Sequence, residues 1–316
     1  MALSRLLFLI LPLKTNLPAL AQLSLTIVLS RHNMKIVCIC ESGASVNCIA
    51  SGLIHDHEIA MVIVPDFSAT KPKSKKPSTK KKRPKKKKNA LSRIANRLFF
   101  KVVPMKVSHE NVEKEIHARG TGELNLKNAC SNFKSVPAYA INSKSTAALI
   151  AEQEPDILFV CGAPILRNRI FEIAKYGSVN FHYGYSPKYK GQHTLLWAYN
   201  RADHQSLGGT FLKIDAGVDT GTPIAFMFPE VEPSDSLDVI EAKLALLARD
   251  NASAAVAAAL KTSPESIVND DEDRQEFMIR HADYGLTEQL RYYAQRIQNK
   301  FFRGGSVLRE EEVKIV

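Results

Sequence analysis

The chain contains, at residues 34–40, the apolar run MKIVCIC. Such a run is typical of the first buried strand of a domain. A turn with one glycine at residues 41–44, a helical segment at 45–55 and a second apolar run at 58–64 follow it. Short apolar runs that alternate with helical segments indicate a parallel sheet with covering helices. The sequence therefore predicts an α/β fold, with a mostly parallel sheet flanked by helices.

The same alternation continues along the chain. The run DILFVCG at residues 156–162 is apolar almost throughout, which predicts a strand buried on both faces. We expect further strands at residues 178–181, 208–214 and 223–228, and helices at residues 111–120, 145–152, 194–200, 239–261 and 290–301. Residues 123–140 have the composition of a loop. The turn at 41–44 contains only Gly43, whereas a dinucleotide-binding turn needs three spaced glycines, so the sequence does not favour NAD.

Composition and charge describe a globular protein with one strongly basic segment. The chain has 316 residues, 45% of them apolar, which is enough for one large core or two modest domains. Its net charge is +11, but residues 71–88 contain 12 basic and no acidic residues, so the remainder carries −1. The basicity is therefore local, and a general nucleic-acid-binding surface is not predicted.

The basic segment has few apolar residues to bury. We expect residues 68–89 to form a disordered loop, because Lys, Pro, Ser and Thr cannot offset the entropy of ordering. Lys71 to Lys88 is either a solvated charge run or a site that captures a polyanion such as RNA, or an anionic membrane surface. Residues 90–103 have the spacing of an amphipathic helix, which more often docks on a core than on a membrane.

The first 33 residues contain no acidic residue. They are a secretory signal, an organellar presequence, or sequence upstream of a start at Met34, and we favour the last of these. The apolar run at residues 6–13 is too short and interrupted for a membrane span, so no stable membrane insertion is expected. The predicted location is the cytoplasm, or an organelle if residues 1–33 are a presequence.

Cysteine and histidine spacing argues against disulfides and metal. The five cysteines are odd in number and none forms a Cys-x2-Cys pair, which is typical of a reduced cytosolic protein. Cys161 is interpreted as a core residue, since free cysteine behaves as a small hydrophobe. The spacing of His193, Asp203 and His204 fits no zinc pattern, so no metal site is predicted.

Candidate reacting groups lie in the segment GSVNFHYGYSPKYKG at residues 177–191 and in DAGVDTG at residues 215–221. Asn180 and His182 are two apart in a predicted strand, so an amide and an imidazole project from one face. The glycines and proline that follow predict an irregular loop, where functional groups are often carried. The second segment supplies a carboxylate in a turn bounded by glycine.

The order of these motifs resembles that of the folate-dependent formyltransferases, which include glycinamide-ribonucleotide, methionyl-tRNA and sugar N-formyltransferases. The resemblance covers about residues 34–230. It rests on DILFVCG with Ile165 and Leu166, on Asn180-Phe181-His182, on PKYKG at residues 187–191 and on GVDTG at residues 217–221. It implies a Rossmann-like fold and 10-formyltetrahydrofolate as formyl donor.

The resemblance also assigns residues. By position, Asn180, His182 and Asp219 correspond to the catalytic trio of the family. Gly162, Ile165 and Leu166 would line the pterin pocket of the donor, and Asp215 would help to close its other side. Two hydrogen-bond donors on one strand face suit an oxyanion, and a carboxylate can orient the imidazole or assist removal of the amine proton.

The acceptor is expected to be a small-molecule amine, such as an amino sugar nucleotide. Residues 231–316 read as a helical C-terminal region, without the alternating strands of the tRNA enzyme's C-terminal barrel. Methionyl-tRNA formyltransferase with a reduced C-terminal region is the alternative, because the tRNA enzyme has a basic loop at the position of Lys71 to Lys88. A third hypothesis is a non-catalytic protein of this fold that associates with RNA or a membrane. The expected organisation is an extension at 1–33, a catalytic domain at 34–230 and the region 231–316.

Overall fold

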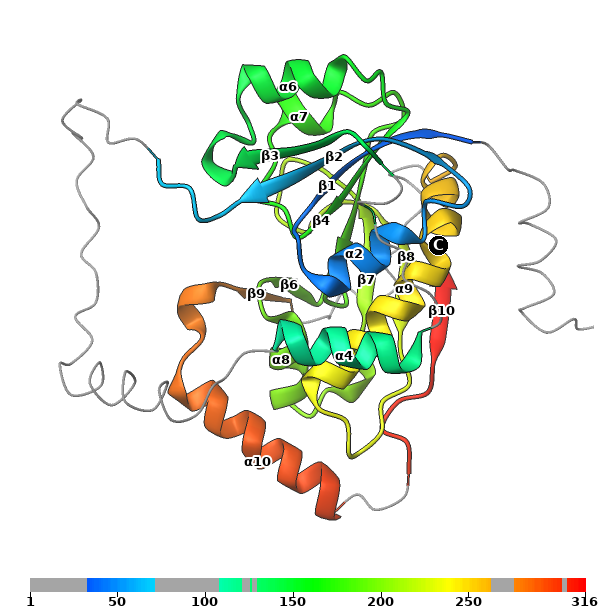
Figure 1. Cartoon of the computed structure of the whole chain (residues 1–316). Helices are drawn as coiled ribbons and strands as arrows, with labels where there is room; N and C mark the ends of the chain where they lie inside the picture. The colour runs from blue at the N-terminus through cyan, green and yellow to red at the C-terminus, as the bar shows by residue number, and fades with distance from the viewer. Residues whose placement is uncertain (1–32, 72–107, 121–125, 127–129, 263–275, 303–305) are drawn as a thin grey trace, which may run out of the picture. The chain divides into compact units, whose positions relative to one another are not determined.

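The computed structural model describes residues 33–71, 108–120, 126, 130–262, 276–302 and 306–316 (Figure 1). The residues before 33, most of the predicted loop at 68–89 and the predicted helix at 90–103 lie outside the described residues.

An eight-stranded sheet forms the centre of the described fold, with strand order β10-β8-β7-β5-β4-β1-β2-β3. Its strands are β1 (Lys35–Cys40), β2 (Glu58–Asp66), β3 (Phe133–Pro137), β4 (Ile157–Cys161), β5 (Ser178–His182), β7 (Gly209–Lys213), β8 (Pro223–Phe228) and β10 (Glu312–Ile315). The five strands from β3 to β5 are parallel to one another, whereas β7, β8 and β10 pair antiparallel. The order β3-β2-β1-β4-β5 is the Rossmann-like arrangement. The predicted fold class is confirmed.

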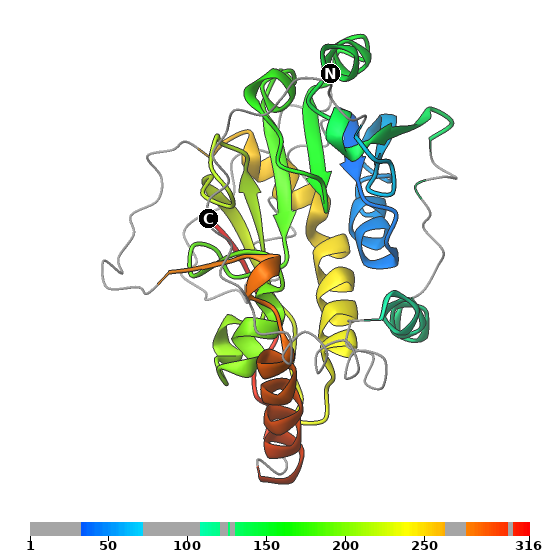
Figure 2. The same cartoon turned by 90° about the vertical axis from the view of Figure 1, so that its left-hand side faces the viewer.

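Helices cover both faces of this sheet (Figures 1 and 2). They are α2 (Ala44–Ser51), α4 (His109–Arg119), α6 (Lys144–Ala151), α7 (Asn168–Phe171), α8 (Thr194–Asn200), α9 (Leu237–Ala259) and α10 (Leu286–Phe302). Short 3₁₀ helices occur at Ala138–Ala140 (η1), His204–Ser206 (η2) and His281–Asp283 (η4). Buried side chains of α2, α8 and α9 share one core, while those of α6 and α7 belong to the core on the opposite face.

Strand β1 shows how the sequence creates two cores. Ile36 and Cys38 lie in the core beneath α9, and Val37 and Ile39 in the core beneath α6 and α7. Successive side chains of a strand point to opposite faces, so a strand covered on both sides must be apolar throughout. This requirement is the physical reason why residues 36–40 of β1 are all apolar.

Helix α9 packs closely because small residues face the core. Ser236 caps its first turn by accepting a hydrogen bond from the Val239 N–H, 3.4 Å away. Ala245, Ala248 and Ala252 are fully buried, so neighbouring backbone can approach the helix closely. A β-carbon on Gly52, the residue after α2, would overlap the backbone carbonyl of Arg249 in α9.

The region 231–316 differs from the helical extension expected from sequence. Helix α9 is part of the main core, and residues 33–316 form one compact unit. Two strands also come from this region: β10, and β9 (Phe277–Ile279), which pairs in parallel with β6 (Tyr189–Gly191) in a separate two-stranded sheet. Strand β3 lies within residues 123–140, which were expected to be loop. It is an edge strand with only one buried residue, Val136, so its sequence lacks an apolar run.

Two further observations concern the class of protein. None of the helices in the described part of the chain combines the length and the apolar character needed to cross a membrane. All five cysteines are free and buried, and Cys161 is a core residue of β4, as predicted. Burial raises the pKa of the Cys161 thiol well above its usual value.

Replacing Gly52 by Ala should lower the free energy of unfolding by about 1–3 kcal/mol, because α9 must move to admit the new β-carbon. The control is Gly285→Ala, since a β-carbon there would meet no atom within 4 Å, and it should cost less than about 1 kcal/mol. Urea unfolding followed by circular dichroism measures both. Equal losses in the two variants would contradict the close α2–α9 approach.

Candidate functional site

The site begins on β5, where the sheet changes from parallel to antiparallel pairing. Asn180 lies beside Val160 of β4, and His182, the last residue of β5, lies beside Thr210 of β7. The Ser178 hydroxyl donates to the Phe171 carbonyl of α7 at 2.6 Å, so this face of β5 is the one covered by α7. Asn180 and His182 share that face because they follow at intervals of two, as predicted.

His182 contacts acceptor oxygens through both ring nitrogens. Its Nε2 lies 2.9 Å from the Tyr189 carbonyl oxygen, and its Nδ1 lies 3.4 Å from Oδ2 of Asp219. The side chains of His182 and Asp219 are only 7% and 14% exposed, so water screens their interaction weakly. Each ring nitrogen faces an oxygen, so whichever nitrogen carries a proton has an acceptor for it.

Asp219 is fixed by backbone and side-chain hydrogen bonds. Its Oδ2 accepts from the Gly191 N–H at 2.9 Å, and its carbonyl oxygen accepts from the Ser186 hydroxyl at 2.8 Å. Its φ of 52° lies in the left-handed region, which Asp tolerates better than most residues. The carboxylate is thus held between His182 and the backbone of β6.

The loop that carries Asp219 folds back along β5. It leaves β7 at Lys213, which lies opposite Val179 near the start of β5, yet Asp219 contacts His182 at the end of that strand. Asp215 shapes this path, because its Oδ1 accepts from the Gly217 N–H at 2.9 Å and from the Thr220 hydroxyl at 2.7 Å. This oxygen of Asp215, a predicted donor-binding residue, is therefore engaged inside the loop.

Strand β6 supplies the backbone groups that hold His182 and Asp219, and β9 holds β6. Tyr189 is registered with Phe277 and stacks on its ring, with centroids 5.3 Å apart. Lys190 Nζ lies 2.7 Å from Oε2 of Glu276. Gly191 has φ of +94°, and a β-carbon there would overlap the Ile279 carbonyl, so only glycine permits the pairing.

Asp203 holds Lys188 and Tyr189, at the start of β6. Its Oδ2 lies 2.6 Å from Lys188 Nζ and accepts from the Tyr189 hydroxyl at 2.8 Å. Burial alone raises the pKa of Asp203, but the hydrogen bonds from Lys188 and Tyr189 outweigh it, so the pKa lies below its usual value. Burial and the nearby Asp203 raise the pKa of the Tyr189 phenol. Residues 188–191 are therefore held at one end by the Asp203 carboxylate and along β6 by pairing with β9.

The predicted donor-binding residues follow β4. Gly162 has φ of +67° and starts the loop, Ile165 is 67% exposed, and Leu166 is buried in the core beneath α6 and α7. The Asn142 side chain fixes the loop: its Nδ2 donates to the Ile165 carbonyl at 2.9 Å, and its Oδ1 accepts from the Arg167 N–H at 2.7 Å. Leu166 is thus a packing residue, whereas Ile165 offers apolar surface at the carboxyl end of a strand.

The sequence did not reveal the groups that hold His182 and Asp219 in place. The Tyr189 carbonyl and the Gly191 N–H are backbone groups, which no residue type reveals, although the glycine itself was a signal. Thr210 was missed as well: its hydroxyl accepts from the Ser186 N–H at 3.1 Å and donates to the Gly184 carbonyl at 2.7 Å. It links β7 to the loop after His182.

Comparison with known proteins identifies the part of the chain that carries this site. Residues 101–256 match the family model for formyl transferase, and this range contains Asn180, His182 and Asp219. Residues 101–256 are a formyl transferase domain. The predicted family is confirmed.

Sequence relatives of this domain and solved structures that resemble the chain are known. Methionyl-tRNA formyltransferase from Corynebacterium efficiens is 30% identical over 140 residues, 43% of this chain and 44% of that protein. The Clostridium novyi protein of the same name is 38% identical over 85 residues, 27% of this chain and 26% of that protein. The chain thus spans less than half the length of these relatives. The crystal structure of a 4-N formyltransferase from Francisella tularensis is similar at a TM-score of 0.48 and 12% identity, over 90% of this chain and 99% of that one.

Replacing Gly191 by Ala should separate β6 from β9, because the new methyl group overlaps the Ile279 backbone. Gly177→Ala is the matched control, since Gly177 has a similar φ of +92° but no neighbour within 4 Å. Both variants should lose about 1 kcal/mol or more of stability from backbone strain. Hydrogen exchange should accelerate at residues 189–191 and 277–279 in Gly191→Ala alone; equal protection in both variants would contradict the role of β9.

Proposed function

We propose that the protein transfers a formyl group from 10-formyltetrahydrofolate to the amine of a small molecule, such as an amino sugar nucleotide. The observation that carries the proposal is the arrangement of Asn180, His182 and Asp219. An amide and a buried imidazole share one face of β5, and a carboxylate 3.4 Å from the imidazole comes from a distant loop. Three groups of complementary chemistry in one place are harder to explain by packing than by a reaction.

The residues after β4 fit the donor. Its pterin is a flat ring with polar edges, which needs apolar surface and nearby hydrogen-bonding groups. Ile165 supplies exposed apolar surface, and Asn180 lies beside Val160 on the next strand. Ligands of open α/β sheets bind at the carboxyl ends of the strands, which is where this loop lies. When bound, the donor supplies an activated formyl group.

In the proposed reaction, negative charge develops on the formyl oxygen as the amine attacks. The side-chain amide of Asn180 is available to donate to that oxygen, because it forms no hydrogen bond with any other described residue. The His182 ring, fixed between the Tyr189 carbonyl and Asp219, shares this strand face and assists in stabilising the same oxygen. The attacking amine loses a proton, which Asp219 accepts directly or through water. As the bond between the formyl carbon and the donor nitrogen breaks, this proton passes to the donor nitrogen, so tetrahydrofolate leaves and the formyl group stays on the amine.

Methionyl-tRNA remains the second candidate acceptor, since two sequence relatives bear the name methionyl-tRNA formyltransferase. The basic run at Lys71 to Lys88 suits a polyanionic acceptor. We favour the small molecule because the described residues after 230 contribute α9, α10 and two strands of three and four residues, and β9 and β10 pair with different sheets.

His182→Ala should reduce turnover by about two to four orders of magnitude, because it removes the imidazole that assists in stabilising the formyl oxygen. Asp219→Asn should also reduce turnover while keeping an oxygen for the Gly191 N–H. Loss of 10-formyltetrahydrofolate with a panel of amino sugar nucleotides and Met-tRNA measures the reaction. The control is the exposed His55→Ala, which should behave as wild type. Near-normal turnover by His182→Ala would refute its assigned role.

Deleting residues 71–88 separates the two acceptors. Small-molecule formylation should be unchanged, whereas formylation of Met-tRNA should be lost if the basic run captures RNA. Because electrostatic capture of RNA weakens steeply with salt, any Met-tRNA activity of the intact chain should also fall as salt rises. Equal turnover of Met-tRNA with and without residues 71–88 would exclude this segment from the acceptor site.

A further inference from the structure

Helix α10 buries mainly polar residues, together with Tyr292, against its own domain and leaves most of its apolar side chains exposed. Gln289 and Asn299 are fully buried, and Glu288 and Gln295 are 6% and 8% exposed. The apolar side chains on the outside are much more exposed: Leu290 54%, Tyr293 36%, Ile297 56% and Phe301 69%. A surface helix ordinarily buries its apolar stripe against the core. This orientation leaves most of the apolar surface of the α10 stripe uncovered by the described residues.

The exposed apolar residues form one continuous stripe. Their spacings of three, four and four residues place them on one face of the helix. From Leu290 to Phe301 the stripe extends about 16 Å along the axis, at about 1.5 Å per residue. Contiguous exposed apolar surface of this kind marks a site of interaction with a protein or a membrane.

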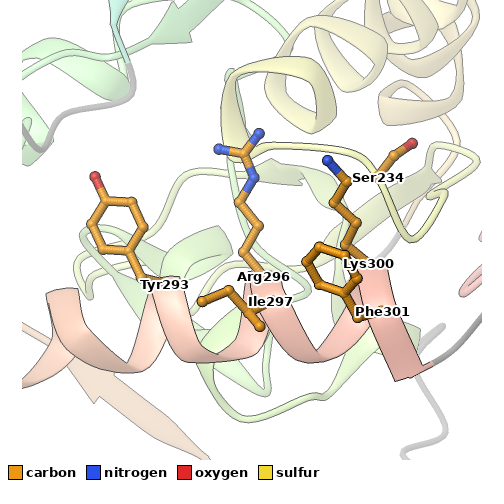
Figure 3. Close-up of a pocket in the computed structure, with 6 residues that line it drawn as sticks. All are labelled: Ser234, Tyr293, Arg296, Ile297, Lys300 and Phe301. Carbon is orange, nitrogen blue, oxygen red and sulfur yellow. The ribbon is translucent and has the colours of Figure 1, made fainter.

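Two cations accompany this stripe. Arg296 and Lys300 extend from α10 towards the loop that carries Ser234, and with Tyr293, Ile297 and Phe301 they line a pocket of about 270 Å³ (Figure 3). Within the described residues neither cation forms an ion pair, whereas Arg291 is paired with Glu288 at 2.7 Å. The exposed apolar side chains of α10 are therefore bordered by two cations, one of which, Lys300, lies 5.8 Å from the centroid of the Phe301 ring.

We propose that α10 docks the protein on an anionic lipid bilayer. The helix would lie in the plane of the interface, with Leu290, Ile297 and Phe301 in the headgroup–acyl boundary. Arg296 and Lys300 would extend to lipid phosphates, as long basic side chains do at interfaces. With 17 residues and a polar inner face, α10 lies on the membrane rather than crossing it.

Charge decides among the possible occupants of the stripe. A second copy of the chain would bring another Arg296 and Lys300 against the first pair, and four apolar side chains fall well short of the 20–30 residues per side of a stable interface. Residues 72–107 of the same chain contain no acidic residue, so they would be repelled as well. Residues 263–275 contain five acidic residues that could neutralise the cations, but they offer only Ile267 and Val268 to the four apolar side chains. RNA would satisfy the cations but not Leu290 and Ile297. An anionic bilayer satisfies both parts of the surface.

The test is co-sedimentation of the full chain with vesicles of phosphatidylcholine, with and without phosphatidylglycerol. Binding should require phosphatidylglycerol and weaken with salt. The double variant Ile297→Glu/Phe301→Glu should bind at least about tenfold more weakly, because it replaces apolar contacts with negative charge. Tyr139→Glu, which changes another exposed aromatic residue of η1, should bind as wild type.

Deletion of residues 71–88 separates the two sources of positive charge. The deleted chain should bind more weakly but should still lose binding through the α10 double variant. The proposal is overturned if the double variant binds as wild type, if only the deletion reduces binding, or if vesicles without phosphatidylglycerol bind equally well. A dimer that the double variant dissociates in light scattering would assign the stripe to a second copy instead. The assay is independent of formyl transfer, so either proposal can fail alone.

Discussion

The register between β5 and β7 is the constraint on which the candidate site depends. The two strands are antiparallel, with His182 opposite Thr210 and Val179 opposite Lys213. The chain therefore leaves β7 beside the start of β5, whereas His182 lies at the end of β5. The loop at 214–222 must return along the strand. Asp215, which bonds the Gly217 N–H and the Thr220 hydroxyl, holds that return path, and Asp219 reaches His182 at 3.4 Å.

The fold could be predicted where a buried strand requires a continuous run of apolar residues in the sequence. A strand covered on both faces must be apolar throughout, so β1 and β4 were evident, and turn residues delimited β8 at Pro223–Phe228. Helix α8 was also predicted with its observed bounds. The edge strand β3 and the short strands β9 and β10 were missed, because their pairing depends on strands elsewhere in the chain rather than on an apolar run of their own.

The site could be predicted only as far as side chains describe it. Asn180 and His182 were placed together from a spacing of two, and the trio with Asp219 came from the resemblance of motifs. Nothing in the residue types indicates that the Tyr189 carbonyl contacts His182 or that the Gly191 N–H contacts Asp219. These contacts depend on where β6 lies, and that position depends on a strand that begins 86 residues after Gly191, at Phe277.

The pairing of β6 with β9 also affects when the site can form while the chain is being synthesised. Every strand of the large sheet except β10, and all three proposed catalytic residues, leave the ribosome before Phe277. A nascent chain can therefore assemble most of its core while the segment that holds His182 and Asp219 still lacks its partner strand. Full alignment of these groups has to wait until Phe277–Ile279 has been made, 86 residues or more after Gly191.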